Sequence, residues 1–198
     1  MFYAFDKPAG LAVHPAAEDV PDLVSWIKRQ RSLPRGLKPA HRLDRGTSGV
    51  VVCGASPKAR KTLNAALAQA EKRYVALVSG TVEADEGVFD RPMKDARRKR
   101  LLEAKTLFQV RERLGRFTLL ELRLVTGRKH QLRRHLADAG LPVVGDARYG
   151  KVRFERLWLH AESLALPDRT IEAPLPGVLA DHLNALRESA EGSPPAQD

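Results

Sequence analysis

A single carboxylate flanked by cations stands out in residues 41–49, which read His-Arg-Leu-Asp-Arg-Gly-Thr-Ser-Gly. Arg42 and Arg45 lie close to Asp44 in sequence, and nearby cations favour the ionised form of a carboxylate. An ionised carboxylate on a loop can act as a nucleophile or a general base. The same residues also suit a salt-bridged surface turn, because charged loops are usually just solvated.

The flanking residues predict how this carboxylate is held. Gly46 and Gly49 give the loop backbone freedom, and residues 50–53, Val-Val-Val-Cys, are typical of a buried strand. We therefore expect Asp44 to project from a loop that runs into the core, with Cys53 as a small core residue. Because Cys53 is the only cysteine, the chain has no internal disulfide and no cysteine-based zinc cluster.

The pattern His-Arg-Leu-Asp-x-x-Thr-Ser-Gly resembles the catalytic motif of the RluA/TruC-type RNA pseudouridine synthases (the RluA family), and this chain matches every fixed position. Five other segments resemble motifs of the same family in the same order: residues 7–15, 72–78, 126–133, 141–146 and 159–161. Several ordered motifs are far more specific than one short match.

The resemblance implies an isomerase that detaches uracil from ribose in RNA, turns the ring and rejoins it through carbon. Such a reaction involves no redox change or hydrolysis, so no cofactor and no metal are expected. By resemblance, Asp44 is the essential catalytic carboxylate, Arg133 its basic partner, and Tyr74 the residue beside the target ring. Asp44 could bond to the substrate or abstract a sugar proton, and the sequence leaves both routes open.

The charge of the chain points to a polyanionic partner. The formal net charge is +10 and the sequence pI is about 10.1, which favours binding to RNA. Six of the ten residues in 91–100 are basic, and this run has few secondary-structure signals. We expect RNA contacts from Arg42, Arg45, Arg97, Arg98, Lys99, Arg100, Arg128 and Lys129. For Arg42 the resemblance implies entry into the space that the target base vacates, with orientation of Asp44 as an equal alternative.

Periodicity predicts more strands than helices. Strands are expected over residues 2–5, 50–54, 73–79, 106–113, 116–125 and 158–166, with a loop and short strand in 142–149. Helices are expected over 22–31, 57–70 and 176–188. The segment 126–140 is expected to begin in a glycine turn and to continue as a helix that ends near Gly140. This indicates an α+β fold: a single pseudouridine-synthase-like catalytic domain with a mixed, mostly antiparallel sheet, flanking helices and a central cleft where Asp44 and Arg133 meet.

The length of 198 residues suits one domain. We expect a catalytic domain over 1–190, a flexible tail over 191–198, and no separate N-terminal RNA-binding domain, because the first family motif begins at residue 7. No apolar run approaches the roughly 18 residues of a membrane span, and no signal peptide is apparent. The expected protein is a cytoplasmic monomer without an obligate protein partner, acting on a tRNA or rRNA stem-loop.

Two other functions fit parts of the pattern. A catalytically silent RNA-binding or ribosome-assembly protein would explain the charge, although not the joint presence of Asp44, Tyr74 and Arg133. A metal-dependent nuclease could use Asp44 with His41 or His130, but no second carboxylate accompanies them. His160, between Leu159 and Ala161, is expected to be a hydrogen-bonded core histidine.

Overall fold

The computed structural model describes residues 1–14, 22–29, 32–95 and 100–191. Its elements in chain order are β1 (Phe2–Lys7), α1 (Leu23–Lys28), β2 (Lys38–Pro39), β3 (Ser48–Gly54), α2 (Pro57–Ala68), β4 (Glu71–Ser79), β5 (Glu86–Phe89), β6 (Met93–Asp95), β7 (Arg100–Leu102), β8 (Thr106–Leu114), β9 (Phe117–Leu124), α3 (Gln131–Asp138), β10 (Leu159–Leu166), β11 (Arg169–Glu172) and α4 (Gly177–Glu191). The expected α+β class, with a mostly antiparallel sheet and flanking helices, is confirmed.

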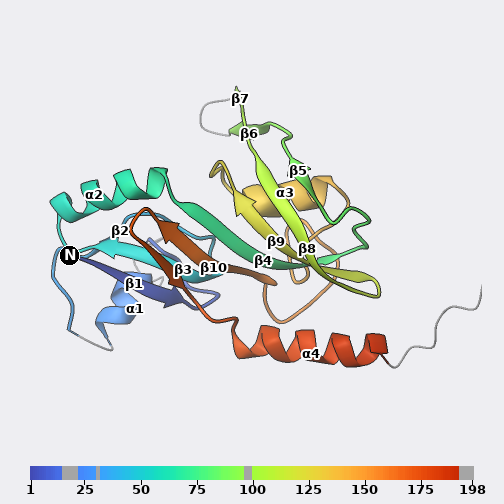
Figure 1. Cartoon of the computed structure of the whole chain (residues 1–198). Helices are drawn as coiled ribbons and strands as arrows, with labels where there is room; N and C mark the ends of the chain where they lie inside the picture. The colour runs from blue at the N-terminus through green and yellow to red at the C-terminus, as the bar shows by residue number, and fades with distance from the viewer. Residues whose placement is uncertain (15–21, 30–31, 96–99, 192–198) are drawn as a thin grey trace, which may run out of the picture.

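One nine-stranded sheet organises the fold (Figure 1). Strands β1, β3, β10, β4, β9, β8 and β5 lie side by side in that order, with β2 pairing on β3 and β11 on β10. Among the described pairs in this sheet, β3 with β10 is parallel and the others are antiparallel. Strand β10 lies between β3 and β4, so a strand from late in the chain joins the two halves of the sheet.

The buried strand β3 supplies side chains to both faces of the sheet. Val51 and Cys53 belong to the main hydrophobic core, which includes α1, whereas Val50 and Val52 belong to a smaller core beneath α2. Alternate residues of a strand point to opposite faces, which matches the position of α1 and α2 on opposite sides of this half of the sheet (Figure 1). Burial raises the pKa of the Cys53 thiol to about 12, as suits a core residue.

Local signals explain where α2 begins and where α3 ends. The Ser56 hydroxyl accepts the backbone N–H of Ala59 at 3.2 Å, and Pro57 occupies the first turn of α2. Helix α3 gives way to Gly140, whose φ of +78° is readily adopted by glycine. The leucines at 132 and 136 bury the inner face of α3 against the core. These features hold the basic face of α3 in a fixed orientation.

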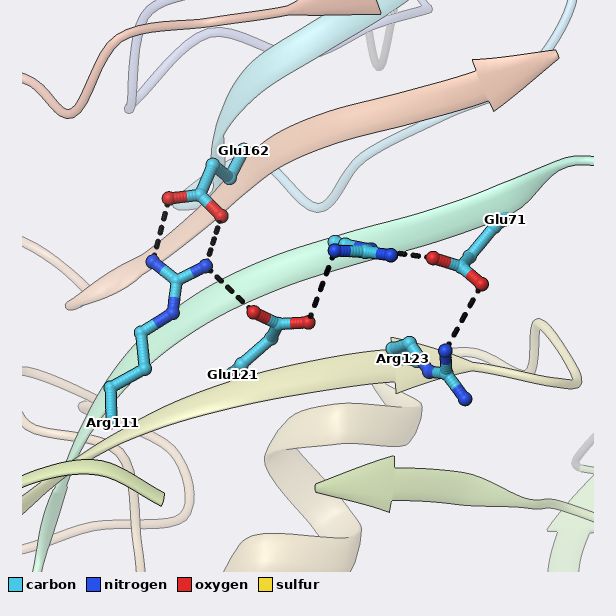
Figure 2. A network of polar contacts seen from close by, with 6 residues as sticks. Glu71, Arg111, Glu121, Arg123 and Glu162 are labelled. Atoms are coloured by element: carbon cyan, nitrogen blue, oxygen red, sulfur yellow. Dashed lines mark hydrogen bonds and ion pairs between the residues drawn. The ribbon is translucent and has the colours of Figure 1, made fainter. Parts of the chain in front are cut away.

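A network of ion pairs lies on one face of the sheet (Figure 2). Tyr74 follows Arg73 on β4 and therefore points to the other face. The members of the network come from β4, β8, β9 and β10: Glu71, Arg73, Arg111, Glu121, Arg123 and Glu162. Arg111 and Glu162 lie where the registers of β8 and β10 shift, and Arg111 Nη1 donates to Glu162 Oε1 at 2.7 Å. Strands β4 and β9 lie between them in the sheet, so the network ties four strands together across the middle of the molecule.

Two expectations about local structure are wrong. Residues 142–149 form turns with a single bridge from Val143 to Val78, because Gly145 at a φ of +75° interrupts any extended run. Within the basic run 91–100, residues 93–95 and residue 100 belong to strands, since β6 and β7 pair antiparallel. Residues 30–31 of the first expected helix, residues 96–99 and the tail over 192–198 lie outside the described residues.

No helix in the described part of the chain is both long and apolar enough to cross a membrane.

Candidate active site

The loop that carries Asp44 lies between β2 and β3 and is fixed to the sheet by its backbone and by His41. The Thr47 N–H donates to the Asp44 carbonyl at 3.1 Å, which closes the turn. His41 Nε2 accepts the N–H of Val52 on β3 at 3.1 Å. Burial, with a smaller contribution from Lys72, lowers the pKa of His41 to about 4. The imidazole is therefore neutral at pH 7 and able to accept this hydrogen bond.

A buried lysine holds the other side of the loop. Lys7 Nζ donates to the carbonyls of Pro8 and Leu11 at 2.8 Å each and to that of Arg45 at 3.2 Å. Burial, and then the charge of Arg156, lower the pKa of Lys7 to about 8. The three hydrogen bonds join the first strand and turn of the chain to the residue that follows Asp44.

Arg133 on α3 faces Asp44 across the cleft, as the sequence predicts. Its Nη1 lies 3.5 Å from Asp44 Oδ2. The other two nitrogens of the guanidinium donate to Asp146, with Nε to Oδ2 and Nη2 to Oδ1 at 2.7 Å each. Planar bidentate pairing of this kind fixes the orientation of an arginine, so Asp146 presents Nη1 toward Asp44.

Asp146 is itself held in an ionised, buried position. Its side chain has no exposed surface, and Oδ1 also accepts the backbone N–H groups of Arg148 at 3.0 Å and Tyr149 at 3.1 Å. Burial alone would raise the pKa of Asp146, but the hydrogen bonds from Arg133 and the two backbone groups outweigh it and lower the pKa. The turn after Gly145 thus supplies the counter-charge for the arginine.

A cleft of about 750 Å³ opens beside Asp44. Tyr74 on β4 lies in its wall and is only 8% exposed, so the ring packs in the core while it lines the cleft. Burial, and then the negative charge of Asp44, raise the pKa of Tyr74 well above its ordinary value. Tyr74 is therefore a protonated phenol at neutral pH.

The residues expected to bind RNA separate into three groups. Arg42, Arg128 and Lys129 are exposed and line the cleft. Arg45 instead donates through Nε to the Gly10 carbonyl at 2.8 Å, so it supports the neighbouring turn and does not line the cleft. Arg100 is exposed on β7, outside the lining of the cleft, and Arg97, Arg98 and Lys99 lie outside the described residues.

Three further polar residues lie in the site: Asp146, His130 and Tyr149. From sequence, His130 was considered only as a partner of Asp44 in the nuclease alternative, and Asp146 and Tyr149 were given no catalytic role. His130 Nε2 lies 3.8 Å from Asp44 Oδ1, and His130 Nδ1 lies 3.1 Å from the Tyr149 hydroxyl. Asp146 is the last residue of segment 141–146, which resembles a family motif, and this resemblance indicated that the residue has a role in the site. The sequence does not show that Asp146 pairs with Arg133, and this pairing defines its role.

His160 is fully buried and hydrogen-bonded, as expected for a core histidine. Its Nε2 lies 3.1 Å from the Ala173 carbonyl and its Nδ1 lies 2.8 Å from the Ser48 hydroxyl. Because a carbonyl only accepts, Nε2 carries the proton and Ser48 donates to Nδ1. Arg156 Nη2 donates to the Ser48 oxygen at 2.7 Å. This chain of bonds ties the end of the Asp44 loop to β10.

Solved structures show which class of fold this is. The chain superposes on the human protein described as RNA pseudouridylate synthase domain containing 4 with a TM-score of 0.77, covering 94% of this chain and 90% of that one at 24% identity. A second human structure, domain containing 1, gives a TM-score of 0.75 at 22% identity. The fold is therefore that of a pseudouridine synthase domain.

Sequence comparison gives the family. The RNA pseudouridylate synthase family profile matches residues 1–138. The chain is 37% identical to the ribosomal large subunit pseudouridine synthase D of Xylella fastidiosa, covering 95% of this chain and 67% of that protein. It is 34% identical to the synthase C of Yersinia pestis, covering 93% and 66%. The chain belongs to the RNA pseudouridine synthases, in the RluA-type branch, and spans about two thirds of the length of these relatives.

Proposed function

We propose that this chain converts uridine in structured ribosomal RNA to pseudouridine, with Asp44 as the essential catalytic carboxylate. The observation that carries the proposal is the geometry around Asp44. Its carboxylate lies 3.5 Å from the guanidinium of Arg133, which Asp146 holds in place, and it lies in the same cleft as Tyr74. The cleft volume of about 750 Å³ suits a flipped nucleotide, since ligand sites usually measure roughly 300–1,000 Å³.

Asp44 supports two chemical routes, and both begin from its ionised form. In one route, a carboxylate oxygen forms a bond to the substrate as the bond between ribose and ring nitrogen breaks. In the other, the carboxylate removes a proton from the sugar as uracil departs. In either route Asp44 loses its negative charge in the first step, and Arg133 stabilises the carboxylate before that step.

Tyr74 is placed to act only after Asp44 has reacted. Burial and the charge of Asp44 together hold the phenol protonated in the free enzyme. When Asp44 becomes neutral, its contribution to the raised pKa of Tyr74 disappears, and the phenol gives up its own proton more easily. We infer that Tyr74 gives its own proton to the ring nitrogen freed from ribose, and that the resulting phenolate takes the proton from the ring carbon once the new carbon bond has formed.

Target recognition follows from the charge around the cleft. Arg42, Arg128 and Lys129 can neutralise phosphates on either side of an extruded uridine. Extrusion costs of the order of a few kcal/mol and is easiest in a loop or distorted stem. Relatives named as acting on the large ribosomal subunit favour that rRNA as the substrate, with tRNA as the second candidate.

The proposal also covers the extent of the catalytic domain, the oligomeric state, the location of the enzyme and its cofactor requirement. Residues 1–190 act as the catalytic domain. The enzyme works as a cytoplasmic monomer and needs no cofactor. Gel filtration with light scattering, and activity after dialysis against a chelator, would test the monomer and the absence of a required metal.

The decisive experiment maps pseudouridine across total RNA from the source organism. The gene is left intact, deleted, or restored as wild type, Asp44→Asn or Asp168→Asn. Asp168 is exposed and pairs with Arg169 beside the β10–β11 turn, which makes it a matched control for the loss of one carboxylate. We expect a site to disappear on deletion, to return with wild type and Asp168→Asn, and to stay absent with Asp44→Asn.

The location of the restored site decides between rRNA and tRNA. Restoration of the site by Asp44→Asn would refute the catalytic role and favour an RNA-binding protein. If no site changes on deletion, purified enzyme is added to RNA from the deletion strain and to unmodified rRNA and tRNA transcripts. Failure to form pseudouridine in any of them would refute the proposed activity.

A further inference from the structure

We propose that His130 is a positioning residue that holds the second oxygen of the Asp44 carboxylate through its Nε2–H, and that Tyr149 fixes the imidazole tautomer needed for this. The inference rests on the proposed role of Asp44. Arg133 approaches Asp44 Oδ2, whereas His130 approaches Asp44 Oδ1. The two donors therefore face different oxygens of one carboxylate.

The backbone of His130 points to a functional reason for its position. Its φ of +53° and ψ of +31° are left-handed, and among the described residues it is the one non-glycine with a positive φ. Such a conformation carries strain for a residue of this size and is found most often at functional sites. His130 is also the residue before α3 but makes no capping hydrogen bond with its side chain. The conformation directs the ring toward Asp44 instead.

The contacts of the ring assign its tautomer. Nε2 faces a carboxylate oxygen, which can only accept a hydrogen bond when the group is ionised. Nε2 must then carry the proton, and Nδ1 must accept from the Tyr149 hydroxyl at 3.1 Å. Tyr149 is itself held in place, because its backbone N–H donates to Asp146 and its ring lies under the Arg133 guanidinium at 5.1 Å.

The charges around His130 favour the neutral ring that this arrangement requires. Burial lowers the pKa of His130, the negative charge of Asp44 opposes this effect, and the cations Arg133, Lys129 and Arg148 add to it. A neutral imidazole donates one hydrogen bond without forming a second full ion pair with Asp44. The carboxylate thus stays reactive while it is oriented.

The distance of 3.8 Å from Nε2 to Oδ1 is longer than a hydrogen bond. Catalytic hydrogen bonds are often long in free enzymes and shorten when the substrate binds. Arg133 Nη1 also lies at a long hydrogen-bond distance, 3.5 Å, from Asp44 Oδ2. We expect both donors to close on Asp44 when uridine fills the cleft.

Nuclear magnetic resonance of histidine side-chain nitrogens tests the tautomer without any substrate. In the ¹⁵N-labelled enzyme at pH 7.5, the signals missing from a His130→Asn variant belong to His130. We expect them to report the Nε2–H form in wild type and a mixture of tautomers in Tyr149→Phe and in Asp44→Asn. An Nδ1–H form in the wild-type enzyme would overturn the proposal.

Single-turnover conversion of RNA from the deletion strain tests the consequence for the reaction. His130→Phe and His130→Gly both remove the donor, while glycine also relieves the backbone strain. We expect each to slow conversion about 10- to 100-fold, the effect of one hydrogen bond to a charged group, with unchanged affinity for the same RNA. His130→Asn tolerates the left-handed backbone and keeps an N–H donor, so it should retain a rate within about 5-fold of wild type.

The variants separate this inference from a structural role and from the proposed function. If the backbone conformation were the whole reason for His130, His130→Gly would be as active as wild type. If packing of the ring were the whole reason, His130→Phe would be as active as wild type, and either result would refute the inference. His14→Phe, at an exposed histidine outside the cleft lining, is the control for loss of an imidazole. An active Asp44→Asn enzyme would instead refute the proposed function, whereas an inactive Asp44→Asn beside fully active His130→Phe would refute only the role of His130.

Discussion

Acid should loosen the Asp44 loop through His41. The neutral imidazole accepts the N–H of Val52, and protonation of Nε2 would remove this acceptor. In the unfolded chain His41 titrates near 6.5, whereas in the folded protein its pKa is about 4. Between these values the unfolded chain binds more protons, so the free energy of unfolding falls as the pH drops from about 6.5 to 4.

The size of this effect follows from the shift in pKa. At about 1.4 kcal/mol for each pKa unit, the change from 6.5 to about 4 amounts to about 3 kcal/mol in total. Between pH 7 and pH 4.5, most of that loss, about 2 to 3 kcal/mol, should already be present. This is a large fraction of the 5–15 kcal/mol typical of a folded domain.

Urea unfolding at pH 7 and pH 4.5, followed by the fluorescence of the buried Trp158, measures the effect. His41→Gln keeps an acceptor of similar reach but does not titrate, so its free energy of unfolding should fall by about 2 to 3 kcal/mol less than that of wild type. Other histidines titrate equally in both proteins, and their contributions cancel. An equal loss in wild type and His41→Gln would refute this account of the loop.

Three further substitutions test other parts of the site and sheet. Asp146→Asn leaves Arg133 half-buried without its counter-charge. It should lower the free energy of unfolding by about 1.5–3 kcal/mol, measured by urea unfolding. It should also lower the conversion rate at least about 10-fold, measured in single-turnover assays. Gly49→Ala places a Cβ 2.1 Å from a carbonyl oxygen of β10 at a φ of +113°, so it should destabilise the protein by more than about 2 kcal/mol, seen as a fall in Tm. Arg111→Met breaks the pair with Glu162 on a partly exposed face and should lower the free energy of unfolding by only about 1 kcal/mol or less, with most of that loss suppressed in 1 M salt.

The local structure of this chain was largely predictable because its signals are local. The Ser56-Pro57 cap, the apolar run 50–53 and the glycine that follows α3 each specify an element without help from the rest of the fold. The antiparallel pair of β6 and β7 escaped prediction because charge dominates its sequence. The turns in 142–149 escaped it because Gly145 needs a positive φ that a strand pattern does not reveal.

The site residues that belong to a family motif were predictable from the sequence. Those whose role depends on contacts formed only in the folded chain were not. Resemblance brought Asp44, Tyr74 and Arg133 together, and the structure has all three in one cleft. Neither Asp146 nor His130 could be assigned, because one acts through a partner 13 residues away and the other through an unusual backbone conformation. No spacing rule encodes either property.

The position of β10 in the sheet also determines when the cleft can form during protein synthesis. Strands β3 and β4 are ready early in synthesis, yet the strand that joins them begins at Leu159, well after Ser79 ends β4. At 5–20 residues per second, a ribosome needs roughly 4–16 s to cover that interval. During this time the inner edges of β3 and β4 lack their partner and can pair with other chains. The nascent protein therefore contains Asp44, the proposed catalytic residue, long before the cleft around it is complete.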